Sequence, residues 1–439
     1  MKKREMEDMP LCKFHMKIFA YASGSSFVDG YSLGIIAIAL SVMQSDFDMS
    51  VTMIGLLGMG TLGGMVIGGL VGGYFTDILG RKKMFIIDML LLGIFTTLQF
   101  FVTDPTQLVV LRFLIGIALG TDYPIAGSLM SEFAPSKHRG ALLGGINAFW
   151  FIGYAISYLV GYFLLPLGQG NWRWMLISGA LPIVLLLLAR LNMPESPHWL
   201  IKQGRHKEAN TIVEKVFGQV VVVSHEEQEA KKTSLVDIFK NGYGKRTFFV
   251  STFWSLQVMT TFAIGTYIPE ILGQFGFQDG SQKYLGSAII NLFYLIGIFP
   301  ALYLVEKYGR RPTLIWPFLI TAIALFSLGV LSAGSTPFIF IILIFIIYGI
   351  FNTGMGSHQW IYPYELFPTH VRGTGGGFTT TISRIASAIS TFFFPVILDN
   401  FGVSITMYIA AFLLMIGFVI SAFMAPETKS MNLKEAGSI

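Results

Sequence analysis

The most constraining feature of this sequence is a series of twelve apolar stretches, each long enough to cross a membrane. A transmembrane helix needs about 20 consecutive, mostly apolar residues to cross a hydrocarbon core of about 30 Å. Charged residues make up only 13% of the chain. The predicted spans are 18–43, 52–75, 84–103, 107–131, 141–166, 173–191, 247–268, 285–305, 313–333, 337–361, 375–398 and 403–424. The sequence therefore predicts an all-α membrane protein with twelve transmembrane helices.

The positions of the basic residues predict how these helices are oriented. Lysine and arginine are enriched in short cytoplasmic loops. If the N-terminus is cytoplasmic, 26 of the 30 lysines and arginines lie on the inner side. Only Arg173 and Lys283 then lie outside, and only Arg112 and Arg384 lie within spans. We therefore expect a multi-pass protein of the cell membrane with both termini in the cytoplasm, whose net charge of +5 reflects orientation and not nucleic-acid binding.

A pattern of polar residues occurs twice, with copies 229 to 233 residues apart. The repeated motifs are Asp77-x-x-Gly80-Arg81 with Glu306-x-x-Gly309-Arg310, Glu132-x-x-Pro135-x-x-x-Arg139 with Glu365-x-x-Pro368-x-x-x-Arg372, and Pro194-Glu195 with Pro426-Glu427. We expect two pseudo-symmetric six-helix halves, 1–195 and 246–439, joined by a cytoplasmic linker, 196–245, with amphipathic helices. Parallel repeats of this kind bind substrate between the halves, near the middle of the membrane.

Four motifs resemble those of a known family. They are Gly73-Tyr-Phe-Thr-Asp77-Ile-Leu-Gly80-Arg81-Lys82-Lys83, Arg112-Phe-x-x-Gly116-x-x-x-Gly120, Pro194-Glu-Ser-Pro-His-Trp-Leu200 and Pro426-Glu-Thr-Lys429. Together they resemble the major facilitator superfamily, in its branch of sugar porters and metabolite:proton symporters. The resemblance covers essentially the whole chain. It implies the major facilitator fold and secondary transport by alternating access, without a cofactor.

The repeated charged motifs predict a gate at the cytoplasmic helix ends. Its proposed pairs are Asp77 with Arg81, Glu132 with Arg139, Glu306 with Arg310, and Glu365 with Arg372. The resemblance implies that such pairs close the inner side of the outward-open state and break when the cavity opens inward. The alternative is that these residues only anchor the topology and cap helices. Their duplication in both halves favours a symmetric gate.

Ionisable residues inside the predicted spans are candidates for proton coupling, because charge at the bilayer centre is costly. Asp29 lies about 17 Å along the first span at 1.5 Å per residue. Asp122 and Arg112 lie on the fourth span. Protonation of Asp29 or Asp122 would remove a buried charge and release its partner. The alternative for Asp122 is a static structural pair with Arg112, and Asp88 was assigned to the cytoplasmic network.

Two segments resemble proton symporters of anions. Gly120-Thr-Asp122-Tyr123-Pro124 is similar to phosphate:proton symporters, in which the matching Asp and Tyr serve coupling and substrate binding. Val28-Asp29-Gly30-Tyr31 resembles the first span of that group and of aromatic acid symporters. Ser32 stands where these proteins usually have a second Asp. The seventh span also lacks the Asp and Tyr of phosphate carriers, so phosphate itself is disfavoured.

The candidate substrate site combines features of two groups of transporters. Trp360 and Gln257 stand at spacings that resemble sugar porters, and Asn147 takes the place of a sugar-contacting Gln. Arg384, in contrast, resembles the eleventh span of organic anion and aromatic acid carriers. Its planar guanidinium suits bidentate recognition of a carboxylate. The alternative is that Arg384 pairs with Asp29 across the cavity.

These observations predict a proton-driven symporter of a small organic metabolite, with an organic carboxylate, including an aromatic one, as the favoured substrate. The alternatives are a sugar:proton symporter, a sugar uniporter, and a membrane nutrient sensor. A sensor is disfavoured because only 13 residues follow Pro426. The seven histidines show no metal-ligand spacing, so we expect neither an enzyme nor a metal site. The expected partners are the substrate, the proton and the lipid bilayer, for a protein acting as a monomer.

Overall fold

The computed structural model describes residues 10–133, 135, 138–191, 193–217, 235–240, 242–277, 281–332, 337–429 and 431. Regular structure in these residues is helical, and every predicted span coincides with a helix. The helices are α1 (Lys13–Met43), α2 (Val51–Leu79), α3 (Arg81–Leu98), α4 (Pro105–Phe133), α5 (Arg139–Leu164), α6 (Asn171–Ser178), α7 (Ala180–Arg190), α8 (Pro197–Lys202), α9 (His206–Phe217), α10 (Tyr243–Gln274), α11 (Gly286–Tyr308), α12 (Arg310–Leu331), α13 (Phe338–Ser357), α14 (Tyr362–Leu366) and α15 (Thr369–Met424).

Eleven helical segments of the described chain are long and apolar enough to cross a membrane. The last of them belongs to α15, which contains 56 residues. A straight helix of that length would extend about 84 Å, nearly three times the hydrocarbon thickness of a bilayer. The backbone is interrupted at Gly402, where φ is +73°. This break separates the last two predicted spans, so α15 accounts for two crossings.

Large apolar side chains point outward along these helices. Phe423 is 85% exposed, and Phe163, Leu181, Phe299 and Phe412 are also exposed. A water-soluble protein rarely exposes extensive apolar surface. In a bilayer the same side chains contact lipid, and the helices satisfy their own backbone hydrogen bonds. The surface therefore agrees with the membrane assignment made from the sequence.

The chain divides into two compact units. Unit 1 takes the described residues of Met1–Leu33, Gly63–Tyr154 and Arg173–Gln228, and unit 2 takes those of Gly34–Leu62, Ala155–Trp172 and Glu229–Ile439. Both units are described separately below. They do not coincide with the predicted halves, because one end of each of α1, α2 and α5 contacts helices of the C-terminal part within unit 2. The division at 1–195, 196–245 and 246–439 stays a prediction.

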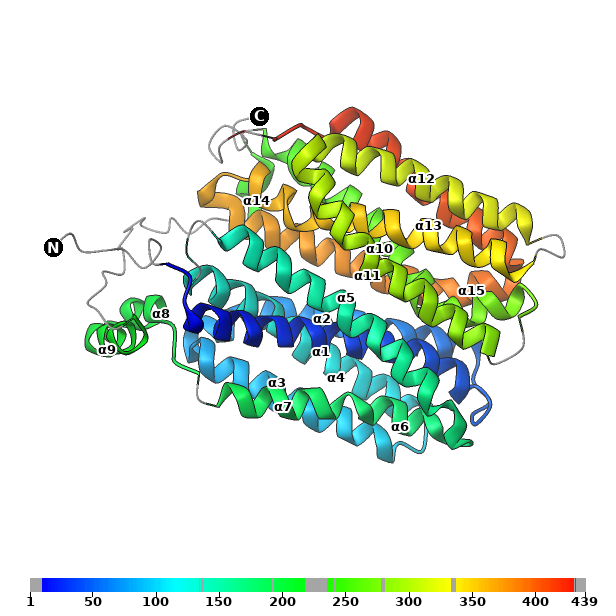
Figure 1. Cartoon of the computed structure of the whole chain (residues 1–439), viewed down its shortest axis with the longest axis horizontal. Coiled ribbons are helices and arrows are strands. Elements are labelled where there is room, and N and C mark those ends of the chain that lie inside the picture. The colour runs from blue at the N-terminus through cyan, green and yellow to red at the C-terminus, as the bar shows by residue number, and fades with distance from the viewer. Residues whose placement is uncertain are drawn as a thin grey trace. The chain divides into compact units, whose positions relative to one another are not determined.

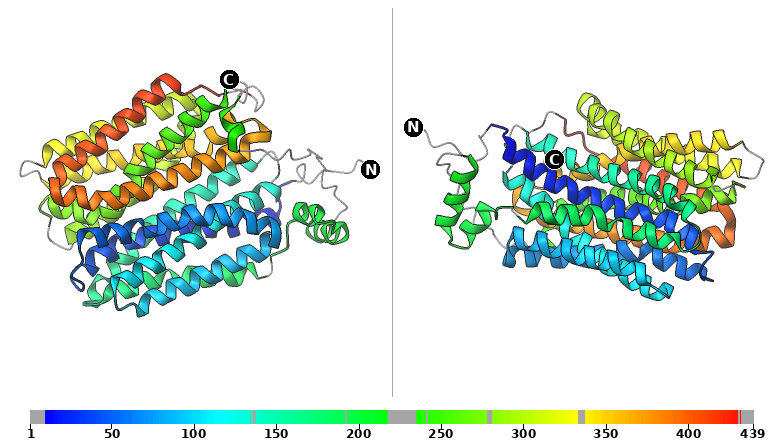
Figure 2. Two further views of the ribbon diagram at one scale, coloured as in Figure 1. Left: turned by 180° about the vertical axis from the view of Figure 1, so that it is seen from behind. Right: turned by 60° about the horizontal axis from the view of Figure 1, so that its bottom comes forward.

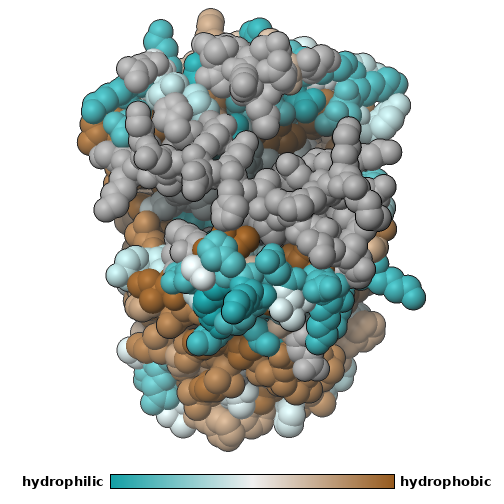
Figure 3. Space-filling view, turned by 90° about the vertical axis from the view of Figure 1, so that its left-hand side faces the viewer, coloured by the Kyte–Doolittle hydropathy of each residue, from teal (hydrophilic) through white to brown (hydrophobic). Residues whose placement is uncertain are grey.

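In unit 1, α3 packs against α4 and α7 (Figure 1). The short helices α8 and α9 lie beyond one end of these long helices in both views of Figure 2. Helix α9 buries Ala209 and Val213 and exposes Glu208 and Lys215, as an amphipathic helix at a polar boundary does. Viewed from this end, hydrophilic residues gather on the face and apolar residues cover the flank below them (Figure 3).

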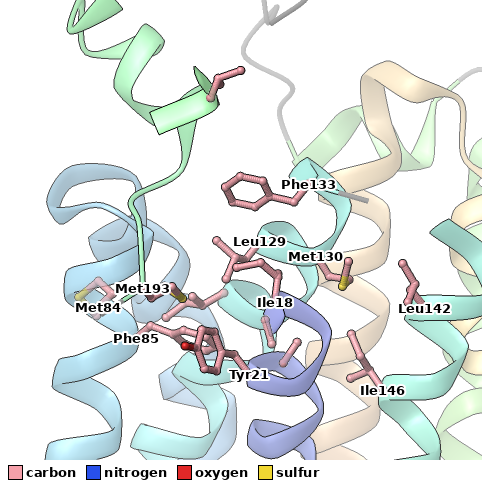
Figure 4. Close-up of a cluster of buried hydrophobic side chains, with 14 residues drawn as sticks. Ile18, Tyr21, Met84, Phe85, Leu129, Met130, Phe133, Leu142, Ile146 and Met193 are labelled. Atoms are coloured by element: carbon pink, nitrogen blue, oxygen red, sulfur yellow. The ribbon is translucent and has the colours of Figure 1, made fainter. Parts of the chain in front are cut away.

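An apolar cluster lies between the ends of α1, α3, α4 and α5 in unit 1 (Figure 4). Its labelled members include Ile18 on α1, Phe85 on α3, and Leu129 on α4, each with no exposed surface. Met193, just after α7, and Val213 of α9 belong to the same cluster. The cluster thus connects the amphipathic segment to the membrane-spanning helices and separates the polar residues deeper in unit 1 from this end.

In unit 2, α10 packs along α15, and α12 packs against both α13 and α15. The far ends of α1, α2 and α5 join this unit through polar contacts. Gln44 donates to Glu270 Oε1 at 3.2 Å, and the Tyr267 hydroxyl donates to the Ile54 carbonyl at 3.1 Å. The Tyr158 hydroxyl donates to the carbonyl of Gly265. These bonds close the end of the helices that is remote from α8 and α9.

Helices α2 and α4 approach each other closely through small residues in unit 1. An added Cβ atom at Gly68 would lie 2.1 Å from the carbonyl oxygen of Ile117. That atom belongs to the helix backbone and cannot rotate away. At Gly73, one and a half turns along the same helix, an added Cβ meets nothing within 4 Å. The two glycines therefore differ in what a side chain would displace.

We predict that Gly68→Leu lowers the thermal unfolding midpoint of the purified protein, because α2 and α4 must separate. Overpacking of this kind typically costs about 1–3 kcal/mol. Gly73→Leu is the matched control and should leave the midpoint nearly unchanged. Equal midpoints for the two variants would show that the close approach of α2 and α4 does not limit stability.

Candidate functional site

A buried arginine at the end of α7 connects four helices of unit 1. The Arg190 side chain has no exposed surface. It donates to the carbonyls of Phe85 at 3.2 Å and Tyr21 at 3.0 Å, and also to the hydroxyl of Ser25. It forms an ion pair with Asp122 at 3.5 Å. The guanidinium carbon lies 3.4 Å from the ring centroid of Phe85, a cation–π contact. One side chain thus holds α1, α3, α4 and α7 together.

Three buried carboxylates surround this arginine. Asp88, Asp122 and Asp29 are each at most 2% exposed. Asp88 and Asp122 interact electrostatically with each other and with Arg190, and Asp29 also interacts with Arg190. The second carboxylate oxygen, Oδ2, of both Asp88 and Asp122 is buried without a hydrogen-bond partner in the described structure. The group therefore contains more acidic than basic side chains in a region shielded from water.

Sequence reasoning predicted only part of this group. It named Asp29 and Asp122, but it assigned Asp88 to the cytoplasmic network and counted Arg190 among the cytoplasmic basic residues. Both side chains are in fact buried against Asp122. The available signal was position, because Asp88 begins the third turn of an apolar helix and Arg190 precedes Leu191, not a charged loop.

Arg112 does not form the static pair with Asp122 that we considered. Ten residues of one helix separate the two, a rise of about 15 Å. Arg112 is instead 1% exposed and donates to the carbonyl of Ser32 on α1 at 3.0 Å. Its Nε atom is buried and has no hydrogen-bond partner among the described residues. Arg112 thus contacts α1 one turn beyond Asp29.

The other predicted site residues of unit 1 lie on α1, α4 and α5. The Tyr31 hydroxyl lies 2.6 Å from the hydroxyl of Ser178 on α6, and its ring is buried. Asn147 is half-buried on α5. Tyr123 belongs to α4, but its side chain lies outside the described part of the structure. The structure therefore does not test the grouping of Tyr123 with Asp122.

Unit 2 contains an uncharged polar cluster around Gln257 of α10. Its amide nitrogen donates to Asn352 Oδ1 at 2.6 Å and to the Thr261 hydroxyl at 2.9 Å. Its amide oxygen accepts a hydrogen bond from Gln359. The Nδ2 donor of Asn352 is buried and has no partner among the described residues. Three of these residues were missed from the sequence, and together they form a hydrogen-bonding surface for a polar ligand.

Arg384 lies on α15 within the same unit. Its side chain is 8% exposed, and its guanidinium carbon lies 5.5 Å from the ring centroid of Phe262 on α10. Phe262 directly follows Thr261, a member of the polar cluster. Trp360 follows Gln359 and is 41% exposed. The structure thus brings Gln257, Trp360 and Arg384 to neighbouring elements of unit 2. Asp29 belongs to unit 1, so the alternative pairing of Arg384 with Asp29 is not tested.

The predicted gate residues of the C-terminal part form a network, although with different pairing. Arg310 contacts Glu365 at 3.1 Å and Glu306 at 3.5 Å. Glu365 also accepts a hydrogen bond from Thr428. Arg372 donates to the carbonyl of Phe367, five residues earlier, instead of pairing with Glu365. The reason is local, because Arg372 occupies the first turn of α15 and reaches back over the preceding loop.

In the N-terminal part, Arg81 donates to the carbonyl of Thr76 at 3.4 Å. The side chains of Asp77, Glu132 and Arg139 lie outside the described structure, so their predicted pairs are not tested. No group of three or more potential metal ligands occurs among the described residues.

The repeated Pro-Glu motifs have a clear structural role. Glu195 accepts a hydrogen bond from the backbone N–H of Lys82, at the start of α3, at 3.1 Å. Glu427 accepts from the N–H groups of Arg310 and Arg311, at the start of α12, at 3.0 and 3.1 Å. A carboxylate at a helix N-terminus satisfies free N–H groups and complements the helix dipole. The two motifs thus cap equivalent helices in the two repeats.

The sequence and the fold were compared with those of known proteins. The family model of "Sugar (and other) transporter" matches residues 17–439. The chain belongs to the sugar (and other) transporter family. A putative metabolite transport protein of Escherichia coli, YaaU, is 37% identical over 99% of this chain and 97% of its own length. The E. coli inner membrane metabolite transport protein YgcS is 36% identical over 99% of this chain and 96% of its own length.

The fold matches that of solved transporters. The xylose transporter XylE from E. coli, in a partially occluded inward-open conformation, superposes with a TM-score of 0.82 at 22% identity, covering 96% of this chain and 100% of XylE. This confirms the major facilitator fold predicted from the sequence. The protein is therefore a multi-pass membrane transporter of the sugar porter and metabolite:proton symporter branch, and not an enzyme.

The cap formed by Glu427 generates a prediction about pH. Partial burial alone would raise the pKa of Glu427, but the backbone donors of Arg310, Lys429 and Arg311 lower it below its usual value. A carboxylate with a lowered pKa stabilises the fold above its ordinary pKa of about 4.3. That contribution disappears as the pH falls through the lowered value.

We predict that Glu427→Gln destabilises the protein at neutral pH by about 1 kcal/mol, the typical value of a helix cap. The difference from the wild type should shrink as the pH falls below 4. Glu306→Gln is the control, because Glu306 is 74% exposed and exposed pairs contribute little. Thermal unfolding across pH measures both, and a loss that is the same at acidic and neutral pH would exclude the charged cap.

Proposed function

We propose that this protein is a proton-coupled symporter that moves a small organic metabolite, with an organic carboxylate as the favoured substrate. Asp29 or Asp122 would carry the proton. Arg384, Gln257, Asn147, Trp360, Tyr31 and Tyr123 are the residues proposed to form the substrate site. The observation that carries the proposal is the coexistence of excess buried acid in unit 1 and a buried arginine beside unpaired amide donors in unit 2.

The preference for a carboxylate comes from the chemistry of Arg384. A guanidinium held in an apolar setting attracts an anion more strongly than the same group in water. Its stacking on Phe262 fixes the plane of the fork, and an aromatic carboxylate could pack on the same ring. A niacin transporter of Acinetobacter baylyi, NiaP, is 25% identical over 98% of this chain, which is compatible with such a substrate.

A sugar is the second candidate, and the uncharged cluster favours it. Gln257, Asn352, Thr261 and Gln359 offer donors and acceptors that suit hydroxyl groups, and the half-exposed ring of Trp360 could pack on a sugar face. An arabinose-proton symporter of Bacillus subtilis is 27% identical over 92% of this chain. The two candidates differ in whether transport needs the charge of Arg384.

Several structural expectations belong to the same proposal. The end that carries α8 and α9 would face the cytoplasm, together with both termini. The two predicted six-helix halves would rock about the site, as parallel-repeat transporters do. The Arg310–Glu365–Glu306 network and its N-terminal counterpart around Arg81 would open and close with that motion.

We predict that Arg384→Gln reduces uptake of a carboxylate substrate about 10- to 100-fold, since a hydrogen bond to a charged group contributes about 1.5–3 kcal/mol. Niacin, arabinose and glucose, each labelled, provide a panel for proteoliposomes that contain the purified protein. Arg205→Gln is the matched control, because Arg205 is exposed between α8 and α9 and pairs only with Glu208 among printed ion pairs. Uptake of a sugar that is unaffected by Arg384→Gln would favour the second candidate.

We also predict that accumulation depends on the pH gradient. An acidic exterior should drive the transported probe above its equilibrium concentration in wild-type proteoliposomes. Asp122→Asn should abolish this accumulation while exchange of labelled for unlabelled probe continues, because the substrate site lies in other residues. Accumulation that is indifferent to pH in the wild type would contradict symport.

A further inference from the structure

The proposed function leaves two buried residues without a role, Asp88 of α3 and Arg190 of α7. Both belong to the charged group of unit 1, and neither lies in the proposed substrate site. Asp88 is 2% exposed, and Arg190 is fully buried. Buried ionisable groups inside a membrane are costly and are retained for function. Their geometry therefore requires an explanation beyond helix packing.

The first step is a charge count. Asp88 and Asp122 surround a single guanidinium, and Asp29 of α1 adds a third acid. Arg190 neutralises one carboxylate only. If Asp88 and Asp122 were both ionised, the group would hold at least one uncompensated negative charge away from water, which is strongly unfavourable. Two carboxylates that share one site avoid this by holding a proton between them.

The second step concerns the hydrogen bonds. One oxygen of Asp122 faces Arg190 at 3.5 Å, a long contact for an ion pair. One oxygen of Asp88 accepts from the backbone N–H of Met89 at 2.7 Å. The Oδ2 atoms of both residues are buried and have no hydrogen-bond partner among the described residues. Each residue thus keeps one buried carboxylate oxygen available to bind a proton.

The third step concerns the connection to movement. Arg190 donates to backbone carbonyls of α1 and α3 and to a hydroxyl of α1, and these bonds do not depend on pH. Only its contact with Asp122 on α4 changes when a proton arrives. Protonation would weaken the contact between α4 and the other three helices, whereas release of the proton would restore it.

We propose that Asp88 and Asp122 share the transported proton and that Arg190 is the fixed cation that senses its presence. The proton binds a carboxylate oxygen of the pair and leaves from it to water, with no other bond formed or broken. The groups that face the pair are Arg190 of α7 and Asp29, Ser25 and the Tyr21 carbonyl of α1. The inference rests on the proposed symport only where it calls the proton transported.

The test is infrared spectroscopy of the purified protein across pH. A protonated, buried carboxyl group gives a C=O stretching band that shifts in heavy water. The wild type should show such a band at neutral pH and lose it at alkaline pH. Asp88→Asn and Asp122→Asn should each abolish the band at neutral pH, because the remaining carboxylate is neutralised by Arg190.

Three further variants separate this account from others. Asp29→Asn should retain the band, and so should Asp104→Asn, the exposed control on the loop before α4. Arg190→Gln should keep the band to a higher pH than the wild type, because the carboxylates lose their cation. Arg190→Lys, which keeps the charge, should titrate as the wild type does and serves if the glutamine variant does not fold.

Two results would overturn the proposal. One is a wild-type protein with no carboxyl band at any pH, and the other is a band that survives Asp88→Asn and Asp122→Asn but disappears in Asp29→Asn. Uptake driven by a pH gradient is a separate readout. If uptake ignores the gradient, symport fails, while the band still decides whether the pair binds a proton.

Discussion

The structure of unit 1 depends on how a single buried arginine is satisfied. Arg190 closes the space between α1, α3, α4 and α7 by donating to two backbone carbonyls and a hydroxyl, stacking on Phe85, and pairing with Asp122. An arginine without these partners could not remain in an apolar interior. The surrounding apolar cluster excludes water from this end and makes each charge in the group strongly felt. Helix packing and electrostatics are therefore one problem in this unit.

The two kinds of polar chemistry are separated along the chain. Carboxylates gather in unit 1, whereas amides, hydroxyls and Arg384 gather in unit 2. A transporter that couples a proton to a substrate needs both, and it gains from keeping them apart, because the substrate then does not compete with the proton for the same carboxylate. The substrate site can consequently vary among relatives while the charged group is kept.

The sequence was sufficient to predict the fold because length and apolarity determine membrane helices almost without tertiary information. The repeat likewise predicted equivalent helix ends, and Glu195 and Glu427 confirm that equivalence by capping α3 and α12. Pairing could not be predicted in the same way. Arg190 appeared cytoplasmic because it ends a helix, and Glu365 contacts Arg310, not Arg372. Such partners are set by the rotation and crossing of helices, which a linear pattern does not contain.

The central claim is that the charged group of unit 1 holds more acid than its arginine can neutralise, so that an aspartate is protonated at neutral pH. Carbon-13 NMR of protein labelled at the aspartate carboxyl carbons measures this directly, since protonated and ionised carboxyl groups have different chemical shifts. The account predicts at least one protonated aspartate signal at pH 7 that is absent from the Asp88→Asn protein. A spectrum in which all aspartates are ionised at pH 7 would contradict it.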